Sequence, residues 1–385
     1  MRFEFAAASR IIFGAGTIGE VASISAEMGR RACVVTGRTA VRAELLLEQL
    51  NGHGVECVTF NVVAEPTTIS AKAAVELARR NKCDLVLSIG GGSVLDTGKV
   101  VAAMLANSGE LQDYLEVVGA GKRLARDCAP HIAIPTTAGT GAEVTRNAVL
   151  SVREHKVKVS MRSPLMLPRL AVVDPELTCS MPASVTASTG LDALTQLIEV
   201  YVSNKANPLT DGICRQGLIR AGRSLRRAYE DGADRPARED MALASLFGGL
   251  GLANAKLGAV HGFAGPLGGM FSAAHGVICA RLLPFVMEAN VRALLSREPD
   301  SPALVRYGEA AQLLTGKSAA KASDGVEWIQ ELCVALKVPA LSEFGLTKEH
   351  FPTAVAKSQK SSSMKGNPIE LTDDELLEIL SQAND

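Results

Sequence analysis

Apolar positions along the first 175 or so residues follow two alternating patterns. Short runs rich in β-branched residues are typical of buried parallel strands, and the stretches between them carry apolar residues at the three- and four-residue spacing of amphipathic helices. This alternation predicts parallel strands joined by helical crossovers. The expected strands are 32–36, 55–60, 85–89, 131–134 and 170–173, the expected helices are 41–50, 70–80 and 94–105, and segment 3–13 is expected to form an extra edge strand or hairpin.

The pattern changes after Asp174-Pro175, where strand-like runs stop and long Ala/Leu-rich periodic segments begin. We therefore expect a domain boundary near residue 178, with an α/β domain over 1–178 and an all-helical domain over 179–385. Proline and glycine breaks divide the second domain into several helices, at 207–208, 231–236, 266–269, 299–302 and 366–368. The last helix, over 371–380, has Thr372 as its expected cap.

Composition narrows the function classes. With 385 residues the chain is too long for a single small module, and its 47% hydrophobic content excludes a disordered chain. A net charge of -1 gives no polycationic surface for nucleic acid, and the apolar segments are too short to span a membrane. Eight cysteines lie singly, with no CxxC and no signal peptide before them, which predicts reduced thiols in a cytoplasmic protein.

Two polar turns follow neighbouring predicted strands. The first, around Gly90, Gly91 and Gly92, leads into a helix whose N-terminal N–H groups suit a phosphate, although a tight turn capped by Ser93 is an equal alternative. It satisfies neither the GxGxxG nor the Walker A pattern. The second turn covers 135–145. Two such turns at the carboxyl ends of adjacent parallel strands predict a dinucleotide site.

Two of the six histidines lie in apolar, glycine-rich surroundings. His261 and His275 are either core residues whose ring nitrogens are hydrogen-bonded or ligands of a metal ion. Burying two imidazoles in the core is less favourable than burying one, which favours the ligand interpretation. On one unbroken helix they would be ~21 Å apart, so a shared ligand requires a chain reversal, which we expect at Pro266, Gly268 and Gly269.

A divalent cation also needs a carboxylate, and Asp192 offers one. Asp192 and Gln196 occupy positions i and i+4 of a predicted helix and so share one face. Taken alone, Asp192 would be interpreted as a residue near a helix N-terminus.

Six motifs, in order along the chain, resemble the iron-containing (group III) alcohol dehydrogenase family over nearly its whole length. The matching stretches are GGGSVLDTGK (90–99), PTTAGTGAEVT (135–145), TGLDALTQ (189–196), LGAVHGFAGPLGG (257–269), AAHGVICARLLPFVMEAN (273–290) and KGNP (365–368). The resemblance implies an N-terminal Rossmann-like dinucleotide-binding domain followed by an all-helical metal and substrate domain. It further implies that NAD(P) contacts Gly91, Gly92, Ser93, Asp96, Thr136, Thr137, Thr140 and Lys158.

The resemblance also implies a metal held by one aspartate and three histidines. Asp192, His261 and His275 match three of these positions, but the fourth is Gln196, a weaker neutral oxygen donor. The remaining Asp/His/His set resembles that of the related glycerol dehydrogenases, which hold zinc, so we expect iron or zinc at a weak or exchangeable site. The chain departs again at Gly265, where the family commonly has a histidine that lines the substrate pocket.

The expected function is hydride transfer between NAD(P) and an alcohol or carbonyl substrate, with the metal polarising the carbonyl oxygen. Asp192, His261 and His275 would form the catalytic centre. Three alternatives stay open within the superfamily: a metal-free reductase resembling maleylacetate reductases, a glycerol-dehydrogenase-like enzyme and a dehydroquinate-synthase-like lyase. A non-catalytic cofactor-binding protein is the alternative from another class.

Cofactor preference and assembly complete the expectations. NAD-preferring members commonly carry an aspartate at the end of the second strand, where this chain has Gly37 followed by Arg38. Loss of the repelling carboxylate and gain of a guanidinium favour NADP(H), unless Gly37 only turns the chain and Arg38 faces solvent. The apolar segment 3–13 leaves an edge strand to cover, which favours a homodimer or larger homo-oligomer.

Overall fold

A computed structural model describes residues 2–38, 41–155 and 157–385. They form two compact units, which we call the sheet unit and the helical unit. The sheet unit comprises Ala6–Thr137 and Gly141–Thr178, and the helical unit comprises Met1–Phe5, Ala138–Thr140 and Cys179–Asp385.

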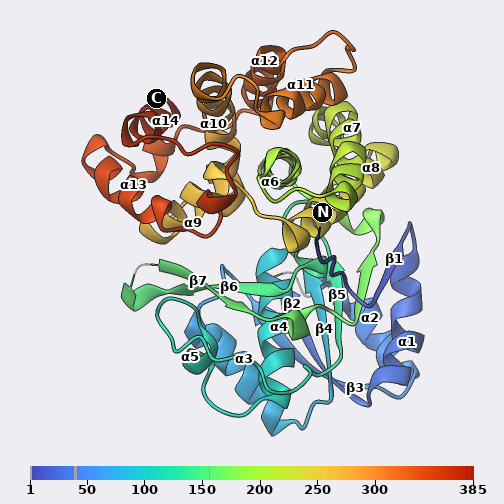
Figure 1. Cartoon of the computed structure of the whole chain (residues 1–385). Coiled ribbons are helices and arrows are strands. Elements are labelled where there is room, and N and C mark those ends of the chain that lie inside the picture. The colour runs from blue at the N-terminus through green and yellow to red at the C-terminus, as the bar shows by residue number, and fades with distance from the viewer. Residues whose placement is uncertain (1, 39–40, 156) are drawn as a thin grey trace. The chain divides into compact units, whose positions relative to one another are not determined.

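The sheet unit is built on six strands in the order β1-β8-β5-β4-β2-β3, and every neighbouring pair is parallel (Figure 1). The extra edge strand expected within 3–13 is β1, which pairs with β8. The strands are β1 (Arg10–Phe13), β2 (Arg31–Gly37), β3 (Glu56–Val62), β4 (Leu85–Gly90), β5 (His131–Pro135) and β8 (Leu170–Val173).

Helices cover both faces of this sheet because successive strand residues point to opposite sides. On β2, Val34 packs into one apolar cluster with α1 and α2, whereas Val35 packs into another with α3 and α4. These elements are α1 (Val21–Met28), α2 (Val41–Gly52), α3 (Thr68–Arg80) and α4 (Gly92–Ala106), with the short α5 (Leu111–Tyr114). The predicted α/β domain with a parallel sheet is confirmed.

An antiparallel hairpin that the sequence analysis did not predict adds to the α3 and α4 side. It consists of β6 (Asn147–Val152) and β7 (Val157–Arg162), and alternate residues such as Ala148 and Leu150 join the core that contains Val100. The period-two pattern of β6, with every second residue buried, was the available signal.

The helical unit is organised around one central helix. Helix α6 (Ala183–Val202) packs against α7, α8, α10 and α11, and all its residues from Gly190 to Val202 are buried (Figure 1). A helix that is buried on every side belongs in a core. Around it lie α7 (Pro208–Glu230), α8 (Arg235–Asn254), α9 (Ala259–Met270), α10 (His275–Arg297), α11 (Pro302–Thr315), α12 (Ala322–Ala335), α13 (Phe351–Gln359) and α14 (Asp373–Asn384). The predicted all-helical second domain is confirmed.

Three local predictions can be checked residue by residue. Thr372 caps α14 as expected, but α4 begins after Gly91 with no side-chain cap, so Ser93 is not its N-cap. The helix break expected at Pro266, Gly268 and Gly269 is wrong, because α9 continues through Pro266 to Met270 and the chain reverses at 271–274. Burial of one face of α9 outweighs the local preference of proline to end a helix.

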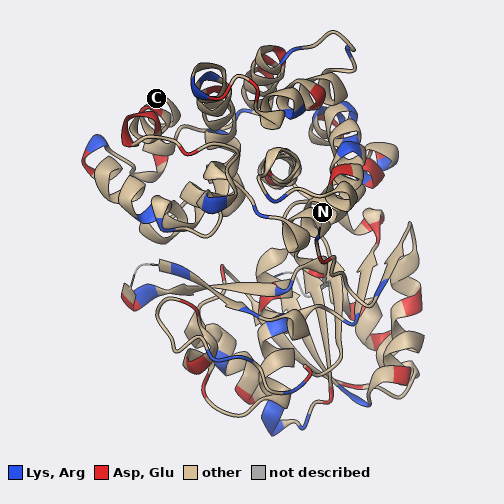
Figure 2. Cartoon of the chain, in the orientation of Figure 1, with Lys and Arg blue, Asp and Glu red and all other residues tan. Residues whose placement is uncertain are grey.

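Charge is spread over the surface of the molecule. Acidic and basic residues are interspersed on both units (Figure 2), consistent with the net charge of -1. Within the described residues no single helix is long and apolar enough to cross a membrane. Helices α8 and α9 would be long and apolar enough only when taken together, and the chain bends by 94° between them.

Helix α4 approaches the sheet closely at Gly98. A Cβ atom there would lie 1.7 Å from Ser88 Oγ and 2.9 Å from His131 Nε2, two buried atoms that are 2.9 Å apart. Burial lowers the pKa of His131 to about 3, and Lys99 contributes in the same direction, so the imidazole is neutral and structural.

Gly98→Ala should therefore destabilise the protein despite the better helix propensity of alanine. Overpacking against Ser88 and His131 is expected to cost ~1–3 kcal/mol. Gly308→Ala is the matched control, since a Cβ at this helical glycine meets nothing within 4 Å and should stabilise α11 by up to ~1 kcal/mol. Denaturant unfolding of both variants checks this, and equal stabilities would contradict it.

Candidate active site

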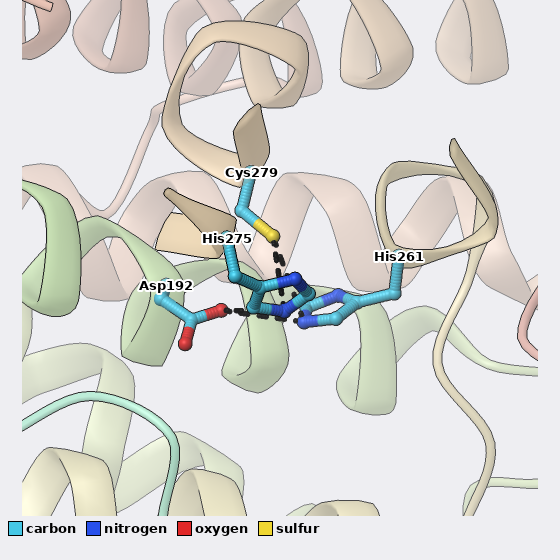
Figure 3. Close-up of side chains that lie close together, drawn as sticks. All are labelled: Asp192, His261, His275 and Cys279. Carbon is cyan, nitrogen blue, oxygen red and sulfur yellow. Dashed lines mark hydrogen bonds and ion pairs between the residues drawn. The ribbon is translucent and has the colours of Figure 1, made fainter. Parts of the chain in front are cut away.

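Three helices of the helical unit bring four potential ligand side chains together (Figure 3). Asp192 comes from the middle of α6, His261 from α9, and His275 and Cys279 from the first turns of α10. One ligand atom from each residue lies within 4.8 Å of the other three. The structure thus joins the three predicted residues Asp192, His261 and His275, which are widely separated in the sequence.

The atoms that converge are chemically suited to a divalent cation. Asp192 Oδ1 lies 3.3 Å from His261 Nε2 and 3.8 Å from His275 Nε2, and Cys279 Sγ lies 3.8 Å and 3.6 Å from the same two nitrogens. Asp192 is 1% exposed, yet its Oδ1 accepts no hydrogen bond from any residue that the structure describes. A buried carboxylate oxygen without a hydrogen bond is costly, and a cation at this position would compensate it.

Glu199 orients His261. It lies on the same face of α6 as Asp192 and Gln196, about one turn after Gln196. The Nδ1 of His261 lies 2.7 Å from Glu199 Oε2, so Nδ1 donates to the carboxylate and Nε2 faces the cluster. A carboxylate behind a ligating histidine fixes the tautomer and the ring orientation and makes the nitrogen a better ligand.

The same carboxylate also holds the start of α9. Glu199 Oε1 accepts the backbone N–H of Val260 at 2.7 Å, and Asn367 Oδ1 accepts that of Ala259 at 3.1 Å. The residue before the helix is Gly258, where a Cβ would lie 2.9 Å from both acceptor oxygens. Side chains distant in the sequence therefore replace a local cap, and Asn367 in the KGNP motif acts on helix α9.

Opposite charges inside the cluster shift the pKa values of His261 and Asp192 toward their charged forms. Burial by itself lowers the pKa of His261, but Cys279, Glu199 and Asp192 outweigh it and hold that pKa well above the usual value. Burial likewise raises the pKa of Asp192, but His261 and His275 bring it below the usual value. The cluster is thus a strongly cation-binding environment in which a proton and a metal ion compete for the same nitrogen atoms.

Gln196, the fourth predicted metal residue, is buried next to this cluster on α6 but points its amide elsewhere. Its Nε2 donates to the backbone carbonyl of Thr140 at 3.3 Å, and its Oε1 accepts no hydrogen bond from the described residues. Within the described residues, Gln196 makes no hydrogen bond to Asp192, His261 or His275.

The sequence analysis missed Cys279, as it missed Glu199. It treats Cys279 as one of eight singly placed reduced thiols, and Cys279 is indeed a free, buried thiol. The available signal was its position four residues after His275, which places both side chains on one face of α10.

Most of the predicted cofactor residues gather at the carboxyl edge of the parallel sheet. Gly37 ends β2, Gly91 and Gly92 join β4 to α4, and Thr136 and Thr137 follow β5, and these three strands are neighbours. The backbone N–H of Thr136 donates to Gly90 at 3.0 Å, and a Cβ on Gly91 would lie 3.3 Å from Thr137 Cγ2. The two turns are therefore in contact, as predicted. Ser93 lies in the first turn of α4.

The remaining predicted cofactor residues have partners within the protein. Asp96 Oδ2 accepts the backbone N–H of Val149 at 3.0 Å, and Asp96 Oδ1 lies 3.4 Å from Lys99 Nζ. Lys158 forms an ion pair with Glu65 at 2.7 Å.

Arg38 and Thr140 have further partners. Arg38 is exposed and donates to the carbonyl of Val63 at 3.2 Å. Thr140 belongs to the helical unit, where its carbonyl accepts from Gln196.

Comparison with known proteins identifies the family to which the chain belongs. Residues 8–175 match the family model described as iron-containing alcohol dehydrogenase, and residues 186–384 match that of the C-terminal domain of the same family. Alcohol dehydrogenase 4 of Saccharomyces cerevisiae strain YJM789 is 34% identical over 380 residues, which cover 96% of each chain. The chain belongs to the iron-containing alcohol dehydrogenase family.

Solved structures agree with this membership. A 1,3-propanediol oxidoreductase superposes with a TM-score of 0.91 and 32% identity over the full length of both chains. The sulfoacetaldehyde reductase of Bifidobacterium kashiwanohense, solved in complex with NAD+, gives a TM-score of 0.89 and 29% identity over 100% of this chain and 99% of that one. The family is one of oxidoreductases, and the predicted resemblance is confirmed.

Glu199→Gln should weaken metal binding without unfolding the helical unit. The amide can still accept the N–H of Val260, but its NH2 group favours the His261 tautomer that carries hydrogen on Nε2 and so blocks ligation. We expect the affinity for Zn²⁺ or Co²⁺ to fall about 10- to 100-fold in chelator competition.

Glu309→Gln makes the same chemical change at a glutamate that pairs with Tyr201 and Arg215, and it should leave metal affinity unchanged. Wild-type affinity in Glu199→Gln would show that this carboxylate does not orient a ligand.

Proposed function

We propose that the chain is an NAD(P)-dependent oxidoreductase that interconverts an alcohol and an aldehyde or ketone by hydride transfer at a divalent metal centre. The observation that carries the proposal is the buried cluster of Asp192, His261, His275 and Cys279, whose ligand atoms lie within 4.8 Å of one another. The same cluster favours a metal enzyme over a metal-free reductase, because Asp192 Oδ1 is buried, accepts no hydrogen bond within the described residues and faces two imidazole nitrogens.

The residues of this cluster fit a divalent cation of the iron or zinc type. Asp192, His261 and His275 would hold it, and Glu199 keeps Nε2 of His261 turned toward it. A bound cation supplies Lewis-acid polarisation of a carbonyl oxygen, and a nicotinamide supplies the hydride. The catalytic role we assign to Asp192, His261 and His275 is to fix the position at which negative charge on the substrate oxygen is stabilised.

Substrate size and proton delivery depend on Gly265 in this proposal. A Cβ at this position would meet no atom within 4 Å, so α9 leaves open space where the family commonly carries a histidine. A glycine offers no side chain to relay a proton. The proton for the substrate oxygen would then come from water or from a ribose hydroxyl of the cofactor, and we infer that the substrate is a small-molecule alcohol or carbonyl compound.

The sheet unit supplies the nucleotide site in this proposal. Backbone N–H groups at the start of α4, near Gly91, Gly92 and Ser93, suit a pyrophosphate, and Thr136 and Thr137 offer further donors beside them. We assign dinucleotide binding to residues 1–178 and metal and substrate binding to 179–385. Asp96, Thr140 and Lys158 remain proposed cofactor residues, although Lys158 would have to exchange its ion pair with Glu65.

A homodimer or larger closed oligomer forms part of the proposal. Strand β1 pairs with β8 on one side only and ends the order of the sheet, so its outer edge offers backbone groups to a second copy. Light scattering of the purified chain tests this directly.

Chelation and His261→Ala should both abolish most of the reductase activity toward aldehydes and ketones. We expect kcat/KM to fall at least about a hundredfold, equivalent to ~2.7 kcal/mol of transition-state stabilisation. His53→Ala is the control, since His53 is exposed in the sheet unit. NAD(P)H absorbance, followed with and without chelator, is the measurement. Unchanged turnover in His261→Ala would support a metal-free reductase instead.

NADPH should be the preferred cofactor, and Gly37→Asp should move the preference toward NADH by about tenfold, ~1.4 kcal/mol. There is room for the new side chain, because a Cβ at Gly37 meets only Val94 Cγ2 at 3.9 Å, and its carboxylate would repel a 2′-phosphate. Gly52→Asp adds the same charge at an open position on α2 and should leave the ratio unchanged. A wild-type protein that already prefers NADH in kcat/KM would refute this.

A further inference from the structure

The fourth corner of the metal cluster is a thiol rather than an imidazole. Cys279 is fully buried, and its Sγ is 3.6 Å from His275 Nε2 and 3.8 Å from His261 Nε2. The two nitrogens are also the atoms that face Asp192 Oδ1, at 3.8 Å and 3.3 Å. We propose that Cys279 is a metal ligand of this protein and that its thiolate takes the place left by glutamine at position 196.

The distances between these atoms match a tetrahedral site. At ordinary zinc bond lengths, a nitrogen and an oxygen ligand on one tetrahedron lie about 3.4 Å apart, and a nitrogen and a sulfur ligand about 3.6 Å. Four of the six distances between the ligand atoms are 3.3–3.8 Å and so lie within about 0.4 Å of these lengths.

Charge supports the same assignment. Asp192 and the Cys279 thiolate together carry two negative charges, which neutralise a divalent cation in a buried place. Gln196 would bring a neutral oxygen, and its amide is already directed at the Thr140 carbonyl. Binding converts the thiol to a thiolate and releases its proton to solvent.

A thiolate changes which metals the protein retains. Soft sulfur ligands favour ions such as Zn²⁺ and Co²⁺, whereas a set with only nitrogen and oxygen ligands is better suited to harder ions. Within the proposed metal-dependent reductase, on which this inference rests, the protein is therefore a zinc enzyme with an Asp/His/His/Cys set.

Cobalt loading of the purified full chain tests the assignment through a spectrum rather than through activity. The Co²⁺ form of the wild type should show a thiolate-to-cobalt charge-transfer band in the near ultraviolet, and zinc X-ray absorption should contain one sulfur at ~2.3 Å. Cys279→Ala should lose the band and bind zinc about tenfold or more weakly. Cys333→Ala, which removes another buried thiol of the helical unit, should keep the band and the affinity.

The double variant Cys279→Ala/Gln196→His supplies a rescue. It restores an Asp192/His261/His275 set with a third imidazole, so it should regain metal affinity while the charge-transfer band stays absent. Wild-type protein that binds cobalt without the band, or Cys279→Ala with unchanged spectrum and affinity, overturns the thiolate assignment and leaves the proposed reductase intact. Wild-type protein that binds no cobalt overturns both the assignment and the metal-dependent function.

Discussion

The site depends on the two hydrogen bonds that the buried carboxylate of Glu199 accepts. One oxygen accepts the N–H of Val260 and so fixes the start of α9, and the other turns the imidazole of His261 toward the cluster. Glu199 lies on central helix α6, seven residues after Asp192, so the same rigid helix provides a ligand and positions another. A buried carboxylate needs such partners, because burying its charge without hydrogen bonds would strongly destabilise the folded protein.

The rest of the helical unit is arranged to keep these groups in register. Asn367 caps α9 beside Glu199, and its Nδ2 donates a 2.7 Å hydrogen bond to Oδ1 of Asn290 on α10. Helix α10 carries His275 and Cys279, so one polar network links two of the three ligand-bearing helices, α9 and α10. Close packing of α6 against α7, α8, α10 and α11 leaves that network little freedom to relax.

Two residues depart from the family pattern that the motifs imply, and both lie on helices that carry residues of the cluster. Gln196 withdraws an imidazole from the metal cluster and bonds to Thr140, while Gly265 leaves open space on α9. The thiol of Cys279 compensates the first change in our proposal, since it approaches the same two nitrogens that face Asp192. The second change leaves open space on α9, which our proposal assigns to the substrate.

The sequence by itself determined the fold class, the two-part organisation, the polar turns at the sheet edge and three residues of the cluster. Those features follow from local periodicity and from motifs in order, which a linear chain displays directly. It did not reveal the continuation of α9 through Pro266, the β6–β7 hairpin, the orientation of Gln196, or the roles of Glu199 and Cys279. The hairpin was visible in the local pattern of β6 but was not recognised, whereas the other features depend on contacts between segments far apart in the chain, which only tertiary packing creates.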